Sequence, residues 1–129
     1  MSRFKDIPGF EGLYQVDPKG NVRSHNRTIV DKYGKHRRLI GAIKRPYDNN
    51  RGYLQVDLYK DGEVYKRYIH KIVYQTFVGI IGDGLEVNHK NSNRRDNTPR
   101  NLEAISKADN LRHMIKKNPH VLKNLKYVN

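Results

Sequence analysis

The chain has 129 residues, of which 36% are hydrophobic and 30% charged, with no cysteine and a net charge of +13. Its length and composition exclude two independent globular domains and wholesale disorder, and the lack of cysteine excludes disulfides and thiolate metal sites. The positive charge predicts a polyanionic partner, nucleic acid first and an anionic membrane surface second, although no apolar run approaches the roughly 20 residues that span a bilayer.

The first predicted element is a β-hairpin between Phe4 and Ser24. Apolar and polar residues alternate on both sides of the segment Asp17-Pro18-Lys19-Gly20. Proline at the second position and glycine at the fourth suit a type I turn. We therefore expect two strands that pair across this turn.

Residues 25–51 form the most basic stretch of the chain. Such a charge run on its own indicates a solvated loop or an edge hairpin. On a chain of net charge +13, the alternative is a β-ribbon that lies in a DNA groove and fixes its position through phosphate contacts. The candidate DNA contacts in and just before this stretch are Arg23, Arg27, Lys32, Lys35, Arg37, Arg38, Lys44, Arg45 and Arg51.

A second hairpin and a short helix are predicted next. Residues 53–59 and 63–69 alternate in polarity, are rich in tyrosine, and flank Asp61-Gly62. Asp-Gly between two such segments is a strong hairpin signal. Apolar residues then recur at helical spacing, which predicts a helix from His70 to Val78 that ends near a glycine.

The remaining elements are predicted as strand, long loop, strand and helix. The first strand covers residues 85–89, a polar loop follows to Asn101, and the second strand covers residues 102–105. Ser106 is the expected N-cap of the last helix, and Asp109 at the third helical position would complete a capping-box-like start.

Several motifs together resemble the HNH nuclease motif of phage and intron-encoded homing endonucleases. The motifs are Val87-Asn88-His89, Asn101-Leu102-Glu103 and Ser106-Lys107-Ala108-Asp109-Asn110, and their spacing agrees as well as their residue types. Residues 4–24 are similar to the NUMOD-type DNA-binding module that commonly precedes this nuclease. Residues 70–77 resemble the His-initiated helix found just before the motif.

This resemblance implies a ββα-metal (His-Me finger) nuclease in which His89 is the general base. Asn88 and Asn110 would bind the metal, and Asn101 would brace the loop of the catalytic site. A histidine, with an ordinary pKa of about 6.5, can accept a proton from water near neutral pH. Mg²⁺ prefers oxygen ligands and keeps several waters, so two amide oxygens are enough, and Mn²⁺ or another divalent metal is an alternative.

The motif adds one geometric condition and two further candidate residues. Neighbouring strand residues point to opposite faces, so Asn88 and His89 can serve one site only if the strand ends or twists there. His113 lies three residues after Asn110, on the same helical face, and is a further candidate metal ligand. His70 is a candidate for metal or phosphate contact, or for packing alone.

The chain departs from the family pattern at two places. Many relatives carry Asp where this chain has Asn88, and a neutral ligand should bind Mg²⁺ more weakly than a carboxylate. Asn91-Ser92 replaces the Asp-Gly that commonly follows the histidine. Serine adopts a left-handed backbone less readily than glycine, so we expect a different loop geometry.

We therefore predict an α+β chain with N-terminal β-hairpins followed by a ββα-metal nuclease. The NUMOD-like DNA-binding module would cover residues 1–67, the nuclease residues 68–117 and a basic tail residues 118–129. The polar N-terminus does not resemble a signal peptide, which predicts a soluble cytoplasmic protein, in the bacterial host cell if the chain is phage-encoded.

The predicted function is metal-dependent hydrolysis of double-stranded DNA, leaving 5′-phosphate and 3′-hydroxyl ends. Nicking by a monomer and double-strand cleavage by a homodimer are both open, as are homing and free-standing phage roles. Two alternatives are kept. One is a catalytically inactive DNA-binding regulatory protein, and the other is an RNA-binding module whose tyrosine-rich strands stack unpaired bases.

Overall fold

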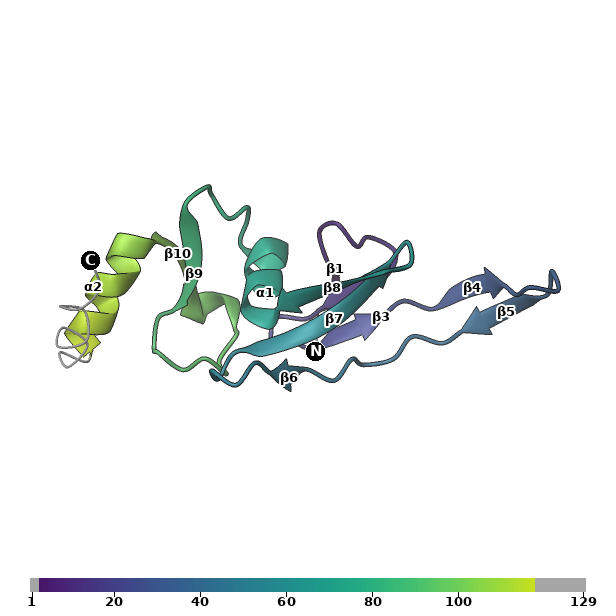
Figure 1. The fold of residues 1–129 in the computed structure, drawn as a ribbon, viewed down its shortest axis with the longest axis horizontal. Helices are drawn as coiled ribbons and strands as arrows, with labels where there is room; N and C mark the ends of the chain where they lie inside the picture. The colour runs from purple at the N-terminus through teal and green to yellow at the C-terminus, as the bar shows by residue number, and fades with distance from the viewer. Residues whose placement is uncertain (1–2, 118–129) are drawn as a thin grey trace.

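The N-terminal part of the protein consists of three small antiparallel sheets. The computed structural model describes residues 3–117, and Figure 1 shows these sheets extending from one side of helix α1. Their strand orders are β1-β2-β3, β4-β5 and β6-β7-β8. The strands are β1 (Lys5–Asp6), β2 (Tyr14–Val16), β3 (Val22–Ser24), β4 (Arg27–Val30), β5 (His36–Leu39), β6 (Tyr47–Asp48), β7 (Leu54–Lys60) and β8 (Glu63–Tyr68).

The C-terminal part places a two-stranded sheet between two helices (Figure 1). Its elements are α1 (Ile69–Phe77), β9 (Leu85–His89), the 3₁₀ turn η1 (Pro99–Asn101), β10 (Leu102–Ser106) and α2 (Lys107–Lys117). The predicted α+β class is confirmed, and α1 lies within one residue of its predicted bounds. No helix within residues 3–117 is both long and apolar enough to cross a membrane. The predicted tail, 118–129, lies outside the described residues.

The start of α2 confirms one half of its sequence prediction. The Ser106 hydroxyl accepts a hydrogen bond from the Asp109 backbone N–H at 3.1 Å, as expected of an N-cap. The Asp109 carboxylate does not return to Ser106 but contacts the Arg112 guanidinium. Ser106 is instead paired with Leu85 in the β9–β10 ladder, so the reciprocal bond of a capping box is not formed.

Both predicted hairpin turns are confirmed. Between β2 and β3, the Gly20 N–H donates to the Asp17 carbonyl at 3.0 Å. Gly20 has φ +91°, and a Cβ at this position would lie 2.8 Å from the Cγ2 of Ile69 in α1. Between β7 and β8, Asp61 and Gly62 have φ +51° and +80°, as a type I′ turn requires.

Gly20→Ala is expected to lower the free energy of unfolding by about 2–3 kcal/mol, because it combines left-handed backbone strain with a contact too close to α1. Urea denaturation followed by circular dichroism measures this loss. Gly62→Ala is the matched control, because Gly62 has φ +80° but nothing within 4 Å of its would-be Cβ. Its loss should be limited to about 1 kcal/mol, and equal losses would show that the contact with Ile69 is unimportant.

One hydrophobic core joins the two parts of the chain. Helix α1 lies at its centre, because the apolar stripe Ile69, Ile72 and Val73 is fully buried. The first sheet, β7 and the β9–β10 pair pack around it through Val16, Val22, Val56, Leu58, Val87 and Leu102. The predicted module boundary between residues 67 and 68 stays a prediction. The residues on its two sides share one hydrophobic core.

The basic stretch folds as a β-ribbon that projects from the body of the molecule (Figure 1). β4 and β5 pair in register from Arg27 with Leu39 to Val30 with His36, and all eight residues are exposed. A solvated loop is therefore wrong, and a hairpin is confirmed. Large apolar side chains such as Val30 (60% exposed) and Ile40 (82%) lie open to solvent among the basic residues.

Candidate active site

The paired strands β9 and β10 fix the directions of Asn88 and His89. The register is regular, with Glu103 opposite Asn88 and Leu102 opposite His89. Because side chains alternate along a strand, Asn88 shares a face with Glu86 and His89 shares the other face with Val87. Val87 and His89 are buried, on the side of α1. β9 ends at His89, which is one of the two conditions under which the sequence allowed both residues to serve one site.

His89 is held by a residue of the loop that follows it. Its Nε2 lies 2.7 Å from the Oδ1 of Asn97, and both side chains are buried, at 4% and 3% exposed. An amide oxygen only accepts hydrogen bonds, so this contact places the imidazole proton on Nε2 and the lone pair on Nδ1. Nδ1 is thus the atom of His89 that can accept a proton.

Asn101 fastens the loop between β9 and β10. It is 7% exposed, its Oδ1 accepts from the Asn91 N–H at 3.0 Å, and its Nδ2 donates to the Asn91 Oδ1 and to the Asp96 carbonyl. Within this loop Ser92 has φ +64°, a left-handed backbone conformation that is less strained for glycine than for serine. The loop therefore depends on side-chain hydrogen bonds for its shape, and the assignment of Asn101 to the catalytic site stays a prediction.

The same loop is attached to the turn between β6 and β7. Arg95 forms an ion pair with Asp48, and Arg94 donates to the Arg51 carbonyl. The Arg94 guanidinium also lies 4.5 Å from the centre of the Tyr53 ring. The Tyr53 ring in turn lies 6.0 Å, centre to centre, from the ring of the buried His89, so the N-terminal part of the chain reaches this histidine.

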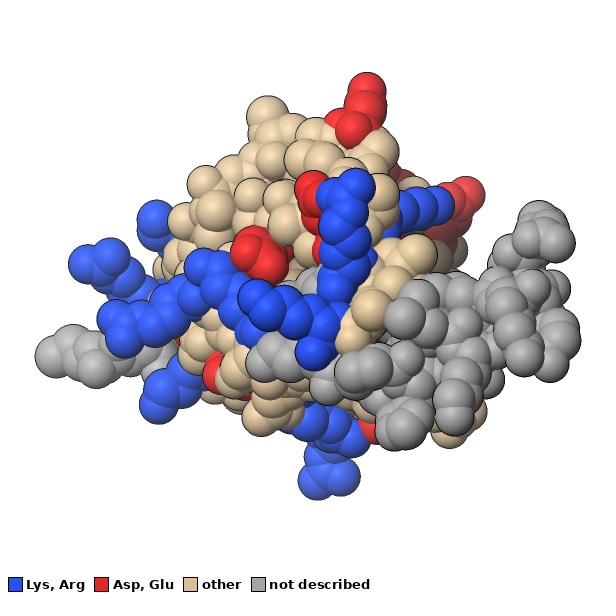
Figure 2. Space-filling model, turned by 90° about the vertical axis from the view of Figure 1, so that its left-hand side faces the viewer, with Lys and Arg blue, Asp and Glu red and all other residues tan. Residues whose placement is uncertain are grey.

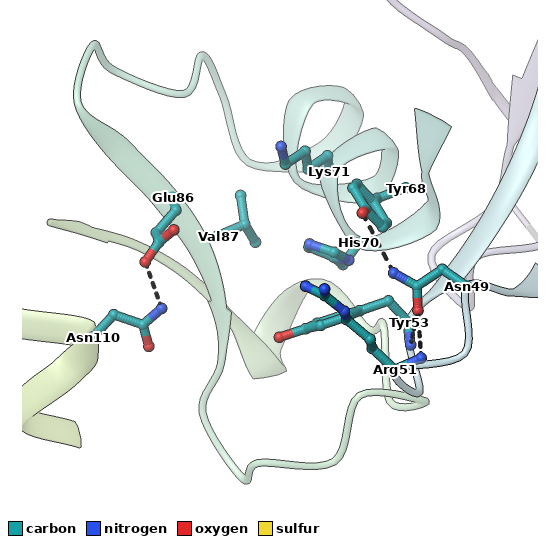
Figure 3. Close-up of a pocket in the computed structure, with 9 residues that line it drawn as sticks. All are labelled: Asn49, Arg51, Tyr53, Tyr68, His70, Lys71, Glu86, Val87 and Asn110. Atoms are coloured by element: carbon teal, nitrogen blue, oxygen red, sulfur yellow. Dashed lines mark hydrogen bonds between the residues drawn. The ribbon is translucent and has the colours of Figure 1, made fainter. Parts of the chain in front are cut away.

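A pocket of about 190 Å³ opens along one edge of β9 (Figure 3). β9 pairs only with β10 among the described strands, so its other edge is free and residues from both of its faces reach the pocket. Glu86 and Asn110 line it from one side, and Val87 and His70 from the other. The remaining lining residues come from the N-terminal module and the start of α1: Asn49, Arg51, Tyr53, Tyr68 and Lys71.

His70 is an almost fully buried imidazole at this pocket, 5% exposed. Its ring centre lies 4.9 Å from that of His89 and 5.3 Å from those of Tyr53 and Tyr68. Burial, and then the nearby charges of His89 and Lys71, lower its pKa from 6.5 to about 3. His70 is therefore neutral near pH 7, and it packs against His89 while facing the pocket.

The depressed pKa of His70 predicts acid sensitivity of the fold. The unfolded imidazole is protonated below about pH 6.5 but the folded one only below about 3, so stability is lost as the pH falls between these values. Between pH 7.5 and 4.5 this group should cost about 2 kcal/mol. His70→Phe should lose less stability over that range in urea titrations. His36→Phe, at an exposed position, should behave as the parent chain, and an identical loss in all three would contradict the assignment.

Asn88 and Asn110 each give their amide nitrogen to a glutamate. The Asn110 Nδ2 donates to the Glu86 Oε1 at 2.7 Å, and the Asn88 Nδ2 donates to the Glu103 Oε1 at 3.0 Å. Both amide oxygens are left free of these contacts. Two amide oxygens on one side of the β9–β10 pair suit a divalent cation, since such a cation prefers oxygen ligands and keeps its own waters.

The two further candidate metal ligands, His113 and His70, stay predictions. Within residues 3–117, no three His, Asp or Glu side chains come together as a metal-binding group. The His113 side chain, a further candidate ligand, lies outside the described residues. His70 faces the pocket opposite Asn110, so its part in metal or phosphate contact stays a prediction.

The candidate DNA contacts fall into four places. Arg23 on β3 donates twice to the Gln15 Oε1 and lies 3.7 Å from the centre of the Phe4 ring. Arg51 lines the pocket. Lys44 lies beside β3, where its backbone N–H donates to the Val22 carbonyl, and Arg45 follows it. The others lie on the β4–β5 ribbon: Arg27, Lys32, Lys35, Arg37 and Arg38. At the end of the molecule that carries α2, Figure 2 shows a band of Lys and Arg side chains with Asp and Glu interspersed.

Sequence reasoning missed several residues of this site. Asn97 had no role assigned from the sequence, and only its contact with His89 reveals one. Tyr53 was expected simply as a strand residue. Glu103 is part of a motif but had no assigned role, and Lys71 and Glu86 lie beside motif residues. None gave a signal of its own, since a lone Lys or Glu on a strand or helix usually faces solvent.

Comparisons with known proteins agree with this geometry. A family model described as HNH endonuclease matches residues 67–112, and a NUMOD4 motif matches residues 3–59. The DNA endonuclease I-HmuI of Bacillus phage SP01 is 30% identical over 112 residues, which are 87% of this chain and 57% of that protein. The chain thus spans less than two thirds of that relative.

A solved structure of I-HmuI is also similar to this chain. It is titled "DNA binding and cleavage by the HNH homing endonuclease I-HmuI" and superposes with a TM-score of 0.72 at 27% identity. The superposition covers 96% of this chain and 66% of that one. Both the sheets of the N-terminal part and the strand–helix region around β9 therefore have a counterpart in one known protein.

Proposed function

Since this chain belongs to the HNH homing endonuclease family and carries an N-terminal NUMOD4 motif, we propose that it hydrolyses phosphodiester bonds of double-stranded DNA. HNH nucleases generally use a divalent metal, and we propose Mg²⁺, with Mn²⁺ as a substitute. The main support is the free edge of β9, where Asn110 and His70 line one pocket and His89 packs behind it against His70. Arg51 and Lys71 line that pocket and would attract a phosphate.

The proposed mechanism assigns one task to each group. His89 accepts the proton of the attacking water at Nδ1, while Asn97 keeps the other imidazole proton on Nε2. Asn88 and Asn110 would hold the divalent cation through their amide oxygens. When bound, such a cation neutralises charge on the phosphate and on the leaving oxygen. The family resemblance implies 5′-phosphate and 3′-hydroxyl products.

Supercoiled plasmid tests this proposal. Incubation with Mg²⁺ or Mn²⁺ should convert it to open-circular or linear DNA, and EDTA should prevent the conversion. The ratio of open-circular to linear product over time shows whether the chain nicks or cuts both strands. A protein that shifts the DNA in a gel yet cleaves nothing with either metal would instead be a DNA-binding regulator.

Arg37→Ala with Arg38→Ala is expected to weaken binding to duplex DNA by about 10-fold near 0.1 M salt and to flatten its salt dependence. Neighbouring residues of β5 point to opposite faces, so the two arginines can meet phosphates on both walls of a groove. Each lost phosphate contact should reduce the slope of log K against log salt by about 0.9. Fluorescence anisotropy at several salt concentrations measures both quantities.

The matched control is Lys19→Ala with Lys66→Ala, which removes the same charge from the β2–β3 turn and from β8. Both control residues are exposed. If the two double variants lose the same slope, net charge rather than the ribbon explains the binding.

A further inference from the structure

Two glutamates lie beside the proposed metal ligands, and their hydrogen bonds orient the side-chain amides of these ligands. Glu103 is directly opposite Asn88 in the β9–β10 register, and Glu86 shares a face with Asn88 two positions earlier on β9. A carboxylate only accepts hydrogen bonds, so each contact, at 2.7 and 3.0 Å, requires that the amide nitrogen and not the oxygen faces the glutamate. In Figure 3 the Asn110 oxygen points away from Glu86.

These two carboxylates are partly withdrawn from solvent and lack an ion-pair partner in the described part of the chain. On a chain with 26 Lys and Arg, neither Glu86 nor Glu103 forms an ion pair within residues 3–117. Both are half-buried. A half-buried carboxylate loses part of its hydration and is stabilised by a nearby positive charge.

We propose that Glu86 and Glu103 are positioning residues for a divalent cation at Asn88 and Asn110. They hold both amide oxygens toward the cation and add two negative charges outside its immediate ligands. The pair thereby compensates for the neutral side chain of Asn88, where many relatives carry Asp. Partners that orient metal ligands commonly affect metal affinity by about 10–100-fold. This inference rests on the proposed function.

Mn²⁺ binding to the protein without DNA separates orientation from charge. Electron paramagnetic resonance of free Mn²⁺ during a titration gives the dissociation constant. Glu86→Gln and Glu103→Gln keep an acceptor oxygen but remove the charge, and each should weaken binding about 3-fold. Glu86→Ala and Glu103→Ala also release the amide and should weaken it by about 10-fold or more. Glu63→Ala, in the β7–β8 hairpin, removes a carboxylate elsewhere and should change nothing.

The Asn110→Ala variant distinguishes the two levels of the proposal. If it weakens Mn²⁺ binding while all four glutamate variants bind like Glu63→Ala, the positioning role is overturned and the proposed metal site stands. If Asn110→Ala and Asn88→Ala both bind Mn²⁺ as the parent does, the metal site and the positioning role fall together. Thermal melting without metal checks that each variant is folded.

Discussion

His89→Ala is expected to lower metal-dependent cleavage of plasmid DNA by about 10³-fold, within the range that a positioned general base contributes. His89 is the proposed general base, because its Nδ1 carries the free lone pair, so the variant loses the group that takes the proton of the attacking water. His70 is the other buried imidazole at the site, and its pKa of about 3 makes it a poor base. Initial rates of supercoiled DNA loss, at saturating metal, measure the effect.

Because His89 is buried against Tyr53 and His70, its truncation also removes packing. His89→Gln is therefore measured beside it, since glutamine fills more of the space and can donate to Asn97. Both variants should bind duplex DNA as the parent does and be equally slow in cleavage. His25→Ala, at an imidazole paired with Asp6 away from the pocket, should cleave normally. Cleavage within 10-fold of the parent by a folded His89→Ala protein would remove His89 from the mechanism.

The elements that local chemistry determines were predictable from the sequence. Asp61-Gly62 specifies a tight turn because both positions need a positive φ, and the structure has it there. The stripe of Ile69, Ile72 and Val73 predicts a helix with one buried face. Ser106 caps α2 through its own hydroxyl. Each of these depends on residues within a few positions of one another.

The surroundings of His89 were not predictable, because they depend on contacts between distant parts of the chain. Tyr53 packs against His89 from 36 positions away, and Asp48 is joined to Arg95 from 47 positions away. No periodicity or turn signal encodes such pairs. The alternation of side chains on β9 did anticipate that Asn88 and His89 would face opposite sides. That the free edge of this strand opens on a pocket became visible only in the folded structure.

Asn97→Ala is expected to slow cleavage by about 100-fold or more while leaving metal affinity unchanged. Its Oδ1 is the acceptor that keeps the His89 proton on Nε2, at 2.7 Å. Without it the imidazole can place its proton on Nδ1, the atom that must accept one, and a base held in the wrong tautomer is strongly impaired. Plasmid cleavage rates and Mn²⁺ titration are the two measurements.

Asn97→Asp makes this prediction specific to proton transfer. An aspartate accepts the same Nε2–H and also stabilises the protonated imidazole through its charge. The acidic limb of the pH–rate profile should then move to higher pH, with cleavage near the parent rate on the alkaline side. A residue that merely packs against His89 would lower the rate at every pH alike. A profile of Asn97→Asp that keeps the parent's acidic limb would show that residue 97 does not control the proton on His89.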